Sequence, residues 1–312
     1  MDTIMPLLYI AVFPGFVFLG AYATLIQWID RKVTAVMQNR VGPPIYQPIA
    51  DFIKLISKEV VIPDNADEIL FKSIPYIALA SIITTIFMIP VWGTPMVSFE
   101  GDIVVIVYLL TIPTVTFFLA GWSSTSPYST IGSMRVMTQL FGYEVSLFLS
   151  FAGCAIIAQS WSVYKISEYF TQNPLMILVN IPGFIVALLA SQGKLERVPF
   201  DTPHAKNEIV GGQFTEYSGR LLGIFLLAID IEMVVLAALI NAVFLGGLHN
   251  ISGFFGFAIF IIKTLVVCLI LTLFKVLMAR VRVDQMVKFS WKYLVPVAVI
   301  QILIDLYIRL KF

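Results

Sequence analysis

The sequence predicts an all-α integral membrane protein with about eight transmembrane helices and one amphipathic surface helix. Hydrophobic residues make up 59% of the 312 residues, charged residues only 12%, and the mean hydropathy is +0.92, well above values typical of soluble domains. Apolar runs of about 20 residues, the length that crosses a bilayer as a helix, recur along the chain. Lys and Arg gather in alternate connections between these runs. We therefore expect one membrane domain over residues 1–312.

Each apolar run is interpreted as one membrane span, and the first run is interpreted as a span that stays in the protein rather than as a cleaved signal peptide. The run from Pro6 to Ile29 is too long for a signal-peptide core and lacks a basic n-region or an A-x-A site. The predicted spans cover residues 6–29, 73–95, 103–122, 143–161, 175–192, 221–245, 255–276 and 292–309.

Lys and Arg indicate how these spans are oriented. Sixteen of the 20 basic residues fall in the connections after spans 1, 3, 5 and 7. Positive charge marks the cytoplasmic side of a membrane protein. We expect these odd connections to face the cytoplasm, with both termini outside, in a multi-pass protein of the cell membrane.

The composition also narrows the chemistry. A net charge of +1 offers no basic face for nucleic acid. Cys154 and Cys268 lie in apolar runs outside any C-x-x-C pattern, which argues against a disulfide, a zinc site or an iron–sulfur cluster in this chain. We find no phosphate loop, nucleophile triad or metal-ligand cluster in the sequence. We therefore expect no catalytic or metal site here, and any electron-transfer cofactors belong to other chains.

The connection after span 1 contains the predicted surface helix, residues 46–59. Its apolar positions follow the i, i+3, i+4, i+7 spacing of a helix face, with charges opposite. The apolar face comprises Ile49, Phe52, Ile53 and Ile56, and the charged face Asp51, Lys54 and Lys58. Such a helix lies on the cytoplasmic membrane surface or, equally compatible with the pattern, packs on a partner.

Residues 191–220 form the other long connection. Between 196 and 219 stand six formal charges and a histidine. Pro199 and Pro203 interrupt helix, and Gly211-Gly212 permits a tight turn. Composition alone allows an exposed polar loop or a loop that folds back into the protein, where irregular backbone at membrane depth is tolerated.

Ionisable residues inside the spans are candidates for function, because a charge at bilayer depth is costly unless paired or hydrated. They are Glu144, Asp230, Glu232, Lys263 and Asp305. Asp230 and Glu232 are two residues apart, about 200° around a helix. We expect one of them to meet Lys263 and the other to face Glu144 and Glu216. Asp305 and Arg309, one turn apart, are expected to form a structural pair at the outer interface.

Buried carboxyls suit ion movement because burial and neighbouring charges set their protonation. A chain of them passes protons or holds a sodium ion, and spacing does not choose between the two. The competing interpretation is a set of buried ion pairs that fix helix register.

Three sequence blocks resemble a known family. They are D-R-K-V-T-A-V-M-Q-N-R-V-G-P-P-I-Y-Q-P-I-A-D-F-I-K-L-I-S-K-E (30–59), G-W-S-S-T-S-P-Y-S-T-I-G-S-M-R-V-M-T-Q-L-F-G-Y-E-V-S (121–146), and R-V-P-F-D followed by E-I-V-G-G-Q-F-T-E-Y-S-G (197–219). The chain is similar to the conserved eight-helix membrane subunit of respiratory complex I. It looks closest to the counterparts in energy-converting membrane-bound [NiFe] hydrogenases and sulfane-sulfur reductases.

The resemblance implies a subunit that joins a peripheral redox arm to ion-pumping, antiporter-like membrane subunits. It also favours residues 191–220 as a cytoplasmic re-entrant polar loop that folds back into the protein and lines a hydrated cavity beneath the redox arm. The arm would contain a small iron–sulfur subunit and a large hydrogenase-like subunit, which hold iron–sulfur clusters and, in a hydrogenase, NiFe. It would oxidise ferredoxin and either evolve hydrogen or reduce sulfane sulfur, while protons or sodium ions are pumped.

Matching positions supply the expected site. Glu144, Glu208 and Glu216 match the family's buried acid path, to which Asp230 and Glu232 are added as ion-path carboxylates. The residues expected at the cavity and redox-arm interface are Arg31, Asp51, Lys54, Arg135, Lys194, Glu196, Arg197, Asp201, His204 and Lys206.

Departures from the family pattern bear on which terminal electron acceptor the complex would use. Quinone-reducing members carry a longer insert where this chain has the contracted Pro43–Gln47, and Lys194, His204 and Lys206 stand where acids are usual. A subunit of the quinone chamber of an NADH– or ferredoxin–quinone oxidoreductase is the alternative. An autonomous transporter is a third possibility, but the sequence shows no internal repeat of the kind expected for one.

Glu216→Gln should uncouple ion transport or stall turnover while leaving assembly intact, because the amide keeps the shape of the carboxyl but cannot take part in its ionisation. Ions moved per electron by the reconstituted complex provide the measurement. Normal stoichiometry in the variant would remove Glu216 from the path.

Overall fold

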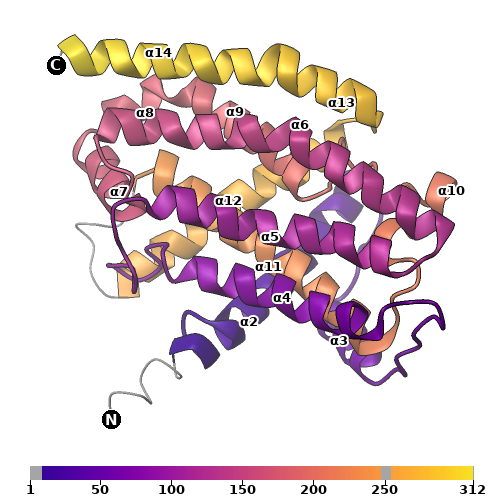
Figure 1. Ribbon diagram of the computed structural model, residues 1–312. Coiled ribbons are helices and arrows are strands. Elements are labelled where there is room, and N and C mark those ends of the chain that lie inside the picture. The colour runs from indigo at the N-terminus through magenta and orange to yellow at the C-terminus, as the bar shows by residue number, and fades with distance from the viewer. Residues whose placement is uncertain (1–8, 247–253, 312) are drawn as a thin grey trace.

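A computed structural model describes residues 9–246 and 254–311, and the regular secondary structure in this part is entirely helical (Figure 1). Within these ranges, seven helices are long and apolar enough to cross a membrane. The long helical elements are α2 (Phe16–Met37), α4 (Glu68–Ile86), α5 (Asp102–Ser123), α6 (Pro127–Ala158), α11 (Gly219–Phe244), α12 (Phe254–Leu277), and α13 (Val283–Phe289), which continues through a π turn into α14 (Val295–Lys311). The predicted all-α membrane fold is therefore confirmed.

The predicted fifth span is divided between two shorter helices, so it is not among the seven that are individually long enough. Residues 175–192 divide between α8 (Leu175–Val179) and α9 (Ile181–Lys194). Pro182 has no backbone N–H to bond the carbonyl of Leu178 one turn earlier. The helix therefore breaks at Asn180, and α8 and α9 together run alongside α6 (Figure 1).

Helices α6 and α13–α14 begin well before the predicted spans. The prediction started the fourth span at Tyr143, but α6 starts at Pro127. Its first half carries Ser129, Ser133 and Gln139, all buried inside the protein. Polar side chains that pack against protein rather than lipid lower the hydropathy of a helix. For this reason a prediction based on hydropathy missed the first four turns of α6.

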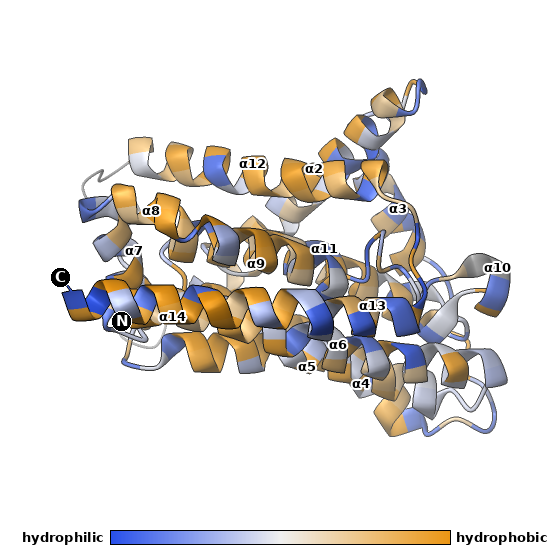
Figure 2. Ribbon diagram, turned by 90° about the horizontal axis from the view of Figure 1, so that it is seen from above, coloured by the Kyte–Doolittle hydropathy of each residue, from blue (hydrophilic) through white to orange (hydrophobic). Residues whose placement is uncertain are grey.

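Helix α11 lies at the centre of the bundle, with most of its residues buried. It packs against α2, α4 and α12, while α6 packs along α5, α9 and α14. Apolar residues dominate the middle of the long helices, and hydrophilic residues gather toward their ends (Figure 2). Helices α3 (Gln47–Ile56) and α10 (Lys206–Ile209) lie at one end, and α7 (Val163–Gln172) at the other (Figure 1).

The surface helix predicted at 46–59 is α3, and it contacts α2 and α11. Phe52 packs toward the protein core. Ile49, Ile53 and Ile56 are exposed. The helix therefore presents an apolar strip outward at the end of the bundle.

The 191–220 segment folds against the bundle rather than into solvent. Between α9 and α11 its regular structure consists of α10 and one 3₁₀ turn (Gly212–Phe214). Phe214 packs edge-on against Phe117 of α5, with ring centroids 5.3 Å apart. Tyr217 stacks on Phe71 of α4 at 3.9 Å and donates its hydroxyl proton to the Phe71 carbonyl. Aromatic anchors on two helices thus hold the segment in place.

Gly132 of α6 admits this segment at backbone distance. A Cβ at Gly132 would lie 2.5 Å from the Gln213 nitrogen and 2.8 Å from the Gly212 Cα, closer than real Cβ contacts. These neighbours are backbone atoms and cannot rotate away. The close approach therefore requires glycine.

Gly132→Ala should displace the 212–214 turn and destabilise the protein by about 1–3 kcal/mol, the usual effect of overpacking. We expect a lower midpoint of thermal unfolding for the purified complex and faster proteolysis within 196–218. Gly20→Ala is the matched control, because no described atom lies within 4 Å of its added Cβ. Equal behaviour of the two variants would contradict the close contact.

Candidate functional site

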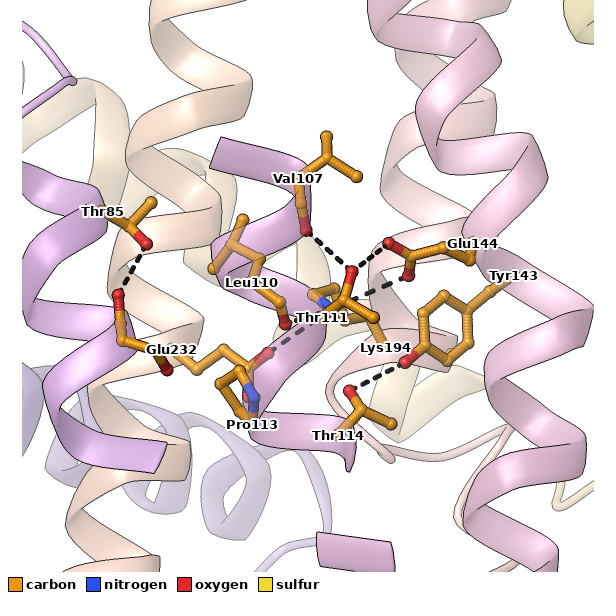
Figure 3. A network of polar contacts seen from close by, with 12 residues as sticks. Thr85, Val107, Leu110, Thr111, Pro113, Thr114, Tyr143, Glu144, Lys194 and Glu232 are labelled. Carbon is orange, nitrogen blue, oxygen red and sulfur yellow. Dashed lines mark hydrogen bonds and ion pairs between the residues drawn. The ribbon is translucent and has the colours of Figure 1, made fainter. Parts of the chain in front are cut away.

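Lys194 is the centre of a buried polar cluster between α5, α6, α9 and α11 (Figure 3). Its side chain is 0% exposed. The ammonium Nζ donates to the carbonyl of Leu110 at 2.7 Å and lies 5.5 Å from the centre of the Tyr143 ring. Pro113 on α5 interrupts the helix ladder beside this carbonyl. The last residue of α9 thus reaches into the bundle.

Two carboxylates flank this ammonium group. Glu144 Oε2 lies 3.9 Å from Lys194 Nζ, and Glu232 Oε1 lies 3.7 Å from it. Both distances exceed ordinary hydrogen-bond length, and neither oxygen has another partner among the described residues. One cation therefore stands between two acids without being hydrogen-bonded to either.

Hydroxyl groups complete the cluster. Thr111 Oγ1 donates to Glu144 Oε1 at 2.6 Å, and Thr114 Oγ1 shares a hydrogen bond of 3.0 Å with the Tyr143 hydroxyl (Figure 3). Thr111 and Thr114 sit on α5, one helical turn apart, on the face toward α6. The cluster thus contains two acids, one base and three hydroxyls in a part of the bundle where polar groups need partners.

A second charged cluster surrounds Asp30, which the sequence patterns did not single out. Asp30 is buried near the end of α2 and forms ion pairs with Arg197 and with Lys275, the latter at 2.7 Å. Thr272 also donates to its Oδ1 at 2.8 Å. The predicted first span ends at Ile29, which assigned Asp30 to a loop. Its position at the head of the 30–59 block was the available signal.

A partly open cavity of about 210 Å³ adjoins the Asp30 cluster. Asp230 faces it and accepts a hydrogen bond of 2.6 Å from Gln27. Glu232 points instead to Lys194, so the two acids of α11 face different sides, as their 200° separation predicts. The charged and polar groups lining the cavity are Gln27, Asp30, Arg31, Arg197, Asp230 and Lys275.

The 191–220 segment carries a third group of polar contacts. Glu196 is buried, and its Oε2 accepts from Gln213 at 2.8 Å and lies 2.8 Å from His204 Nε2. His204 stacks on the Phe214 ring at 5.8 Å. Because Glu196 is two residues beyond Lys194, this group connects the segment directly to the buried cluster.

An open groove of about 1010 Å³ lies beside this segment and α13. Arg135 reaches into it from α6 and pairs with Glu208 at 2.5 Å. Arg280 lines the same groove and pairs with Asp201. These residues form a charged surface at the end of the bundle that carries α10.

Several expected placements are corrected. Glu208 is 61% exposed rather than part of a buried path. Lys263 donates to the carbonyls of Leu245 and Gly246, at the C-terminal end of α11, at 3.0 and 3.1 Å and pairs with no described carboxylate, so its predicted pairing with Asp230 or Glu232 is wrong. Asp305 forms no ion pair with Arg309 in the described part of the chain; it is fully buried and bonded to Gln301.

Other expected residues lie away from the buried cluster. Glu216 is half-buried just before α11, with no hydrogen bond or ion pair to a described residue. Asp51 on α3 pairs with Arg31 at 2.7 Å, and this hydrogen bond lowers the pKa of Asp51. Lys54 is exposed on the same helix. The side chain of Lys206 lies outside the described structure.

Comparison with known proteins gives consistent matches. A family profile described as NADH dehydrogenase matches residues 9–306. The H subunit of the NADH-quinone oxidoreductase of Syntrophotalea carbinolica is 32% identical, over 97% of both chains. Its counterpart in Bacillus cereus strain AH187 is 35% identical, over 96% of this chain and 91% of its own. A solved chain of the membrane-bound sulfane sulfur reductase, an archaeal respiratory membrane complex, superposes with a TM-score of 0.83 at 25% identity, covering 93% of this chain and 96% of that one.

Lys194→Met should leave two buried carboxyls without their cation. Removing one partner of a buried charge group typically costs about 3–5 kcal/mol, so the midpoint of thermal unfolding should fall clearly. Adding Glu232→Gln should recover part of the loss, because the double variant has one acid fewer to neutralise. Lys58→Met, at an exposed position two residues beyond α3, is the control. Equal stability of the Lys194 and Lys58 variants would show that the ammonium does not hold the cluster together.

Proposed function

Because this chain belongs to the NADH dehydrogenase family, in the branch formed by the 1 and H subunits, we propose that it is the membrane-anchor and ion-coupling subunit of a complex-I-like respiratory complex. It would link a ferredoxin-oxidising redox arm, either hydrogen-evolving or sulfane-sulfur-reducing, to antiporter-like subunits that pump protons or sodium ions. The observation that carries this proposal is the buried Lys194, which stands between Glu144 and Glu232 and is hydrogen-bonded to neither.

This cluster has the properties of a charge relay. Two carboxylates and one ammonium leave one excess negative charge when all are ionised, and the low-dielectric surroundings favour taking up one proton to cancel it. Lys194 has a flexible four-carbon stem, and its Nζ is nearly equidistant from the two acids. Whichever carboxyl is ionised attracts the ammonium, and the other holds the proton. The cluster therefore has two arrangements of the kind that coupling requires.

The 191–220 segment would connect this relay to the redox arm. His204 contacts Glu196, and Glu196 lies two residues from Lys194. An electron arriving in a partner subunit next to this segment attracts a proton toward His204 and Glu196. Because Glu196 and Lys194 are both buried, a charge added at Glu196 acts on Lys194 through poorly screened protein and would bias the ammonium between Glu144 and Glu232. Ions would then move in the neighbouring pump subunits.

The partner proposals rest on the surface as well as on the family. The groove with Arg135, Glu208, Asp201 and Arg280 offers exposed charge pairs at the end of the bundle where the redox arm would dock. We propose that this end faces the cytoplasm, in agreement with the concentration of Lys and Arg in the odd connections. Both termini would then lie outside.

The sulfane-sulfur or hydrogenase type of arm is supported by three features. The solved complex with the matching fold is a sulfane sulfur reductase. The contracted 43–47 segment resembles that branch. The cavity beside Asp230 measures about 210 Å³, below the roughly 300–1,000 Å³ of typical small-molecule pockets.

A quinone-chamber subunit is the second candidate, and one observation favours it. The curated relatives at 32–35% identity are subunits of NADH-quinone oxidoreductases. Bound quinone in the purified complex, or inhibition by quinone-site inhibitors, would establish this alternative. Insensitivity to such inhibitors, together with a nickel-bearing or sulfur-reducing large subunit that co-purifies, would establish the first.

Glu144→Gln and Glu232→Gln should each lower the number of ions moved per electron toward zero in the reconstituted complex. Electron transfer in detergent should stay within about twofold of wild type, under about 0.5 kcal/mol of barrier, because no redox centre is touched. Glu68→Gln, on an exposed pair with Lys72, is the matched control and should pump normally. Normal stoichiometry in both buried variants would exclude the relay.

A further inference from the structure

Asp305 on α14 forms a buried acidic site that belongs to neither cluster described above. Its side chain is 0% exposed. Oδ1 accepts a hydrogen bond of 2.9 Å from Gln301 one turn earlier. Oδ2 is shielded from solvent and has no hydrogen-bond partner in the described structure. A lipid-facing position or a surface ion pair would leave this oxygen accessible, so the site requires another account.

Helices α6 and α9 are shaped to receive this carboxyl. A Cβ on Gly153 of α6 would lie 2.9 Å from Asp305 Oδ2, so a larger residue there would displace the carboxyl group. A Cβ on Gly183 of α9 would lie in ordinary contact with the Gln301 side chain, 3.5 Å from its Cγ. The α8–α9 break completes the recess with Asn180. The recess therefore lies between α14, α6 and the α8–α9 break.

Acceptors outnumber donors among the described residues of this recess. Gln301 Nε2 lies within 2.9–3.2 Å of three oxygens, those of Asp305 Oδ1, the Val179 carbonyl and Asn180 Oδ1. Its two N–H groups cannot satisfy all three. Gln301 Oε1 is a further buried acceptor without a described partner. Even when the weak donor Cys154 Sγ, 3.9 Å from Asn180 Oδ1, is counted, Asp305 Oδ2 and Gln301 Oε1 have no described donor, and a proton on Asp305 would supply one.

No cationic group in the described ranges compensates the carboxyl. Among residues 9–246 and 254–311, no Lys, Arg or His nitrogen lies within ion-pair distance of Asp305, including Arg309 one turn along α14. The titratable groups facing it are Cys154 of α6 and Tyr169 of α7, both neutral near pH 7 by their ordinary values. Burying an isolated carboxylate is so costly that such groups neutralise instead.

We propose that Asp305 is a second proton-binding site, which holds one exchangeable proton as a neutral carboxylic acid in the half of the bundle nearest the end of α14. Asp305 lies six residues before Lys311, the last residue of α14, which is about 9 Å along a helix. It packs near the start of α9, whereas Lys194 is the last residue of α9. Proton occupancy is favoured over a metal ion because the Gln301 N–H group occupies the point where the oxygens converge. Release of the proton would leave an uncompensated negative charge against α6, the helix that also carries Glu144.

Infrared spectroscopy of the complete complex tests this site without depending on transport. Wild type should show a protonated-carboxyl C=O band that shifts when H₂O is exchanged for D₂O, and Asp305→Asn should lack that one band. Asp64→Asn, an exposed acid outside the helices, is the control and should keep it. Assembly of the Asp305→Asn complex is checked by its electron-transfer activity, and Asp305→Glu serves as a second variant that should restore a band at a shifted frequency.

Three results would overturn the proposal. A band that is absent from wild type means that Asp305 is ionised, and a band that persists unshifted in D₂O means that its proton is structural and does not exchange. Loss of bound ²²Na⁺ from the Asp305→Asn complex, relative to wild type and Asp64→Asn, means that the site holds sodium. Failure of the relay variants at Glu144 and Glu232 to affect pumping would refute the proposed function but would leave these spectra unchanged.

Discussion

The burial of one ammonium group between two carboxyl groups is the constraint on which the architecture depends. An isolated Lys or Glu at this depth would cost several kcal/mol, so Lys194, Glu144 and Glu232 are tolerable only together. Three helices, α6, α9 and α11, must converge to bring them within 4 Å. The Leu110 carbonyl beside Pro113 and the Thr111 hydroxyl then supply the remaining polar partners. The position of each helix is thus coupled to the charge state of a single site.

The same requirement explains why the irregular segment before α11 lies inside the protein. Backbone without regular hydrogen bonds must be shielded from lipid. Gly132 and the aromatic pair Phe71–Tyr217 seat this segment against α4–α6, and Gln139 donates to the Gly193 and Phe200 carbonyls at 2.6 and 2.8 Å. The first half of α6 is polar for this reason. It packs against loop backbone and offers side chains that complete the loop's hydrogen bonds.

Sequence patterning predicted the class, the surface helix and most spans, because apolar runs of membrane-crossing length are set by the bilayer. It failed where protein rather than lipid surrounds a helix. The buried Ser129, Ser133 and Gln139 hid the start of α6, and a break at Asn180 divided the fifth span. The opposite orientation of Asp230 and Glu232 followed from helix geometry. The partners of Lys263 and the role of Asp30 depend on contacts between residues 17 to 245 positions apart, which no local pattern contains.

The turn that joins α9 to the loop carries cations for both buried acid clusters. Lys194 serves Glu144 and Glu232, and Arg197, three residues later, serves Asp30. Lys194 and Arg197 are too close along the chain to move independently. A partner subunit that displaces this turn would therefore change both clusters at once. A single displacement of this turn would therefore move the cations of both clusters, which lie on two sides of the central helix α11.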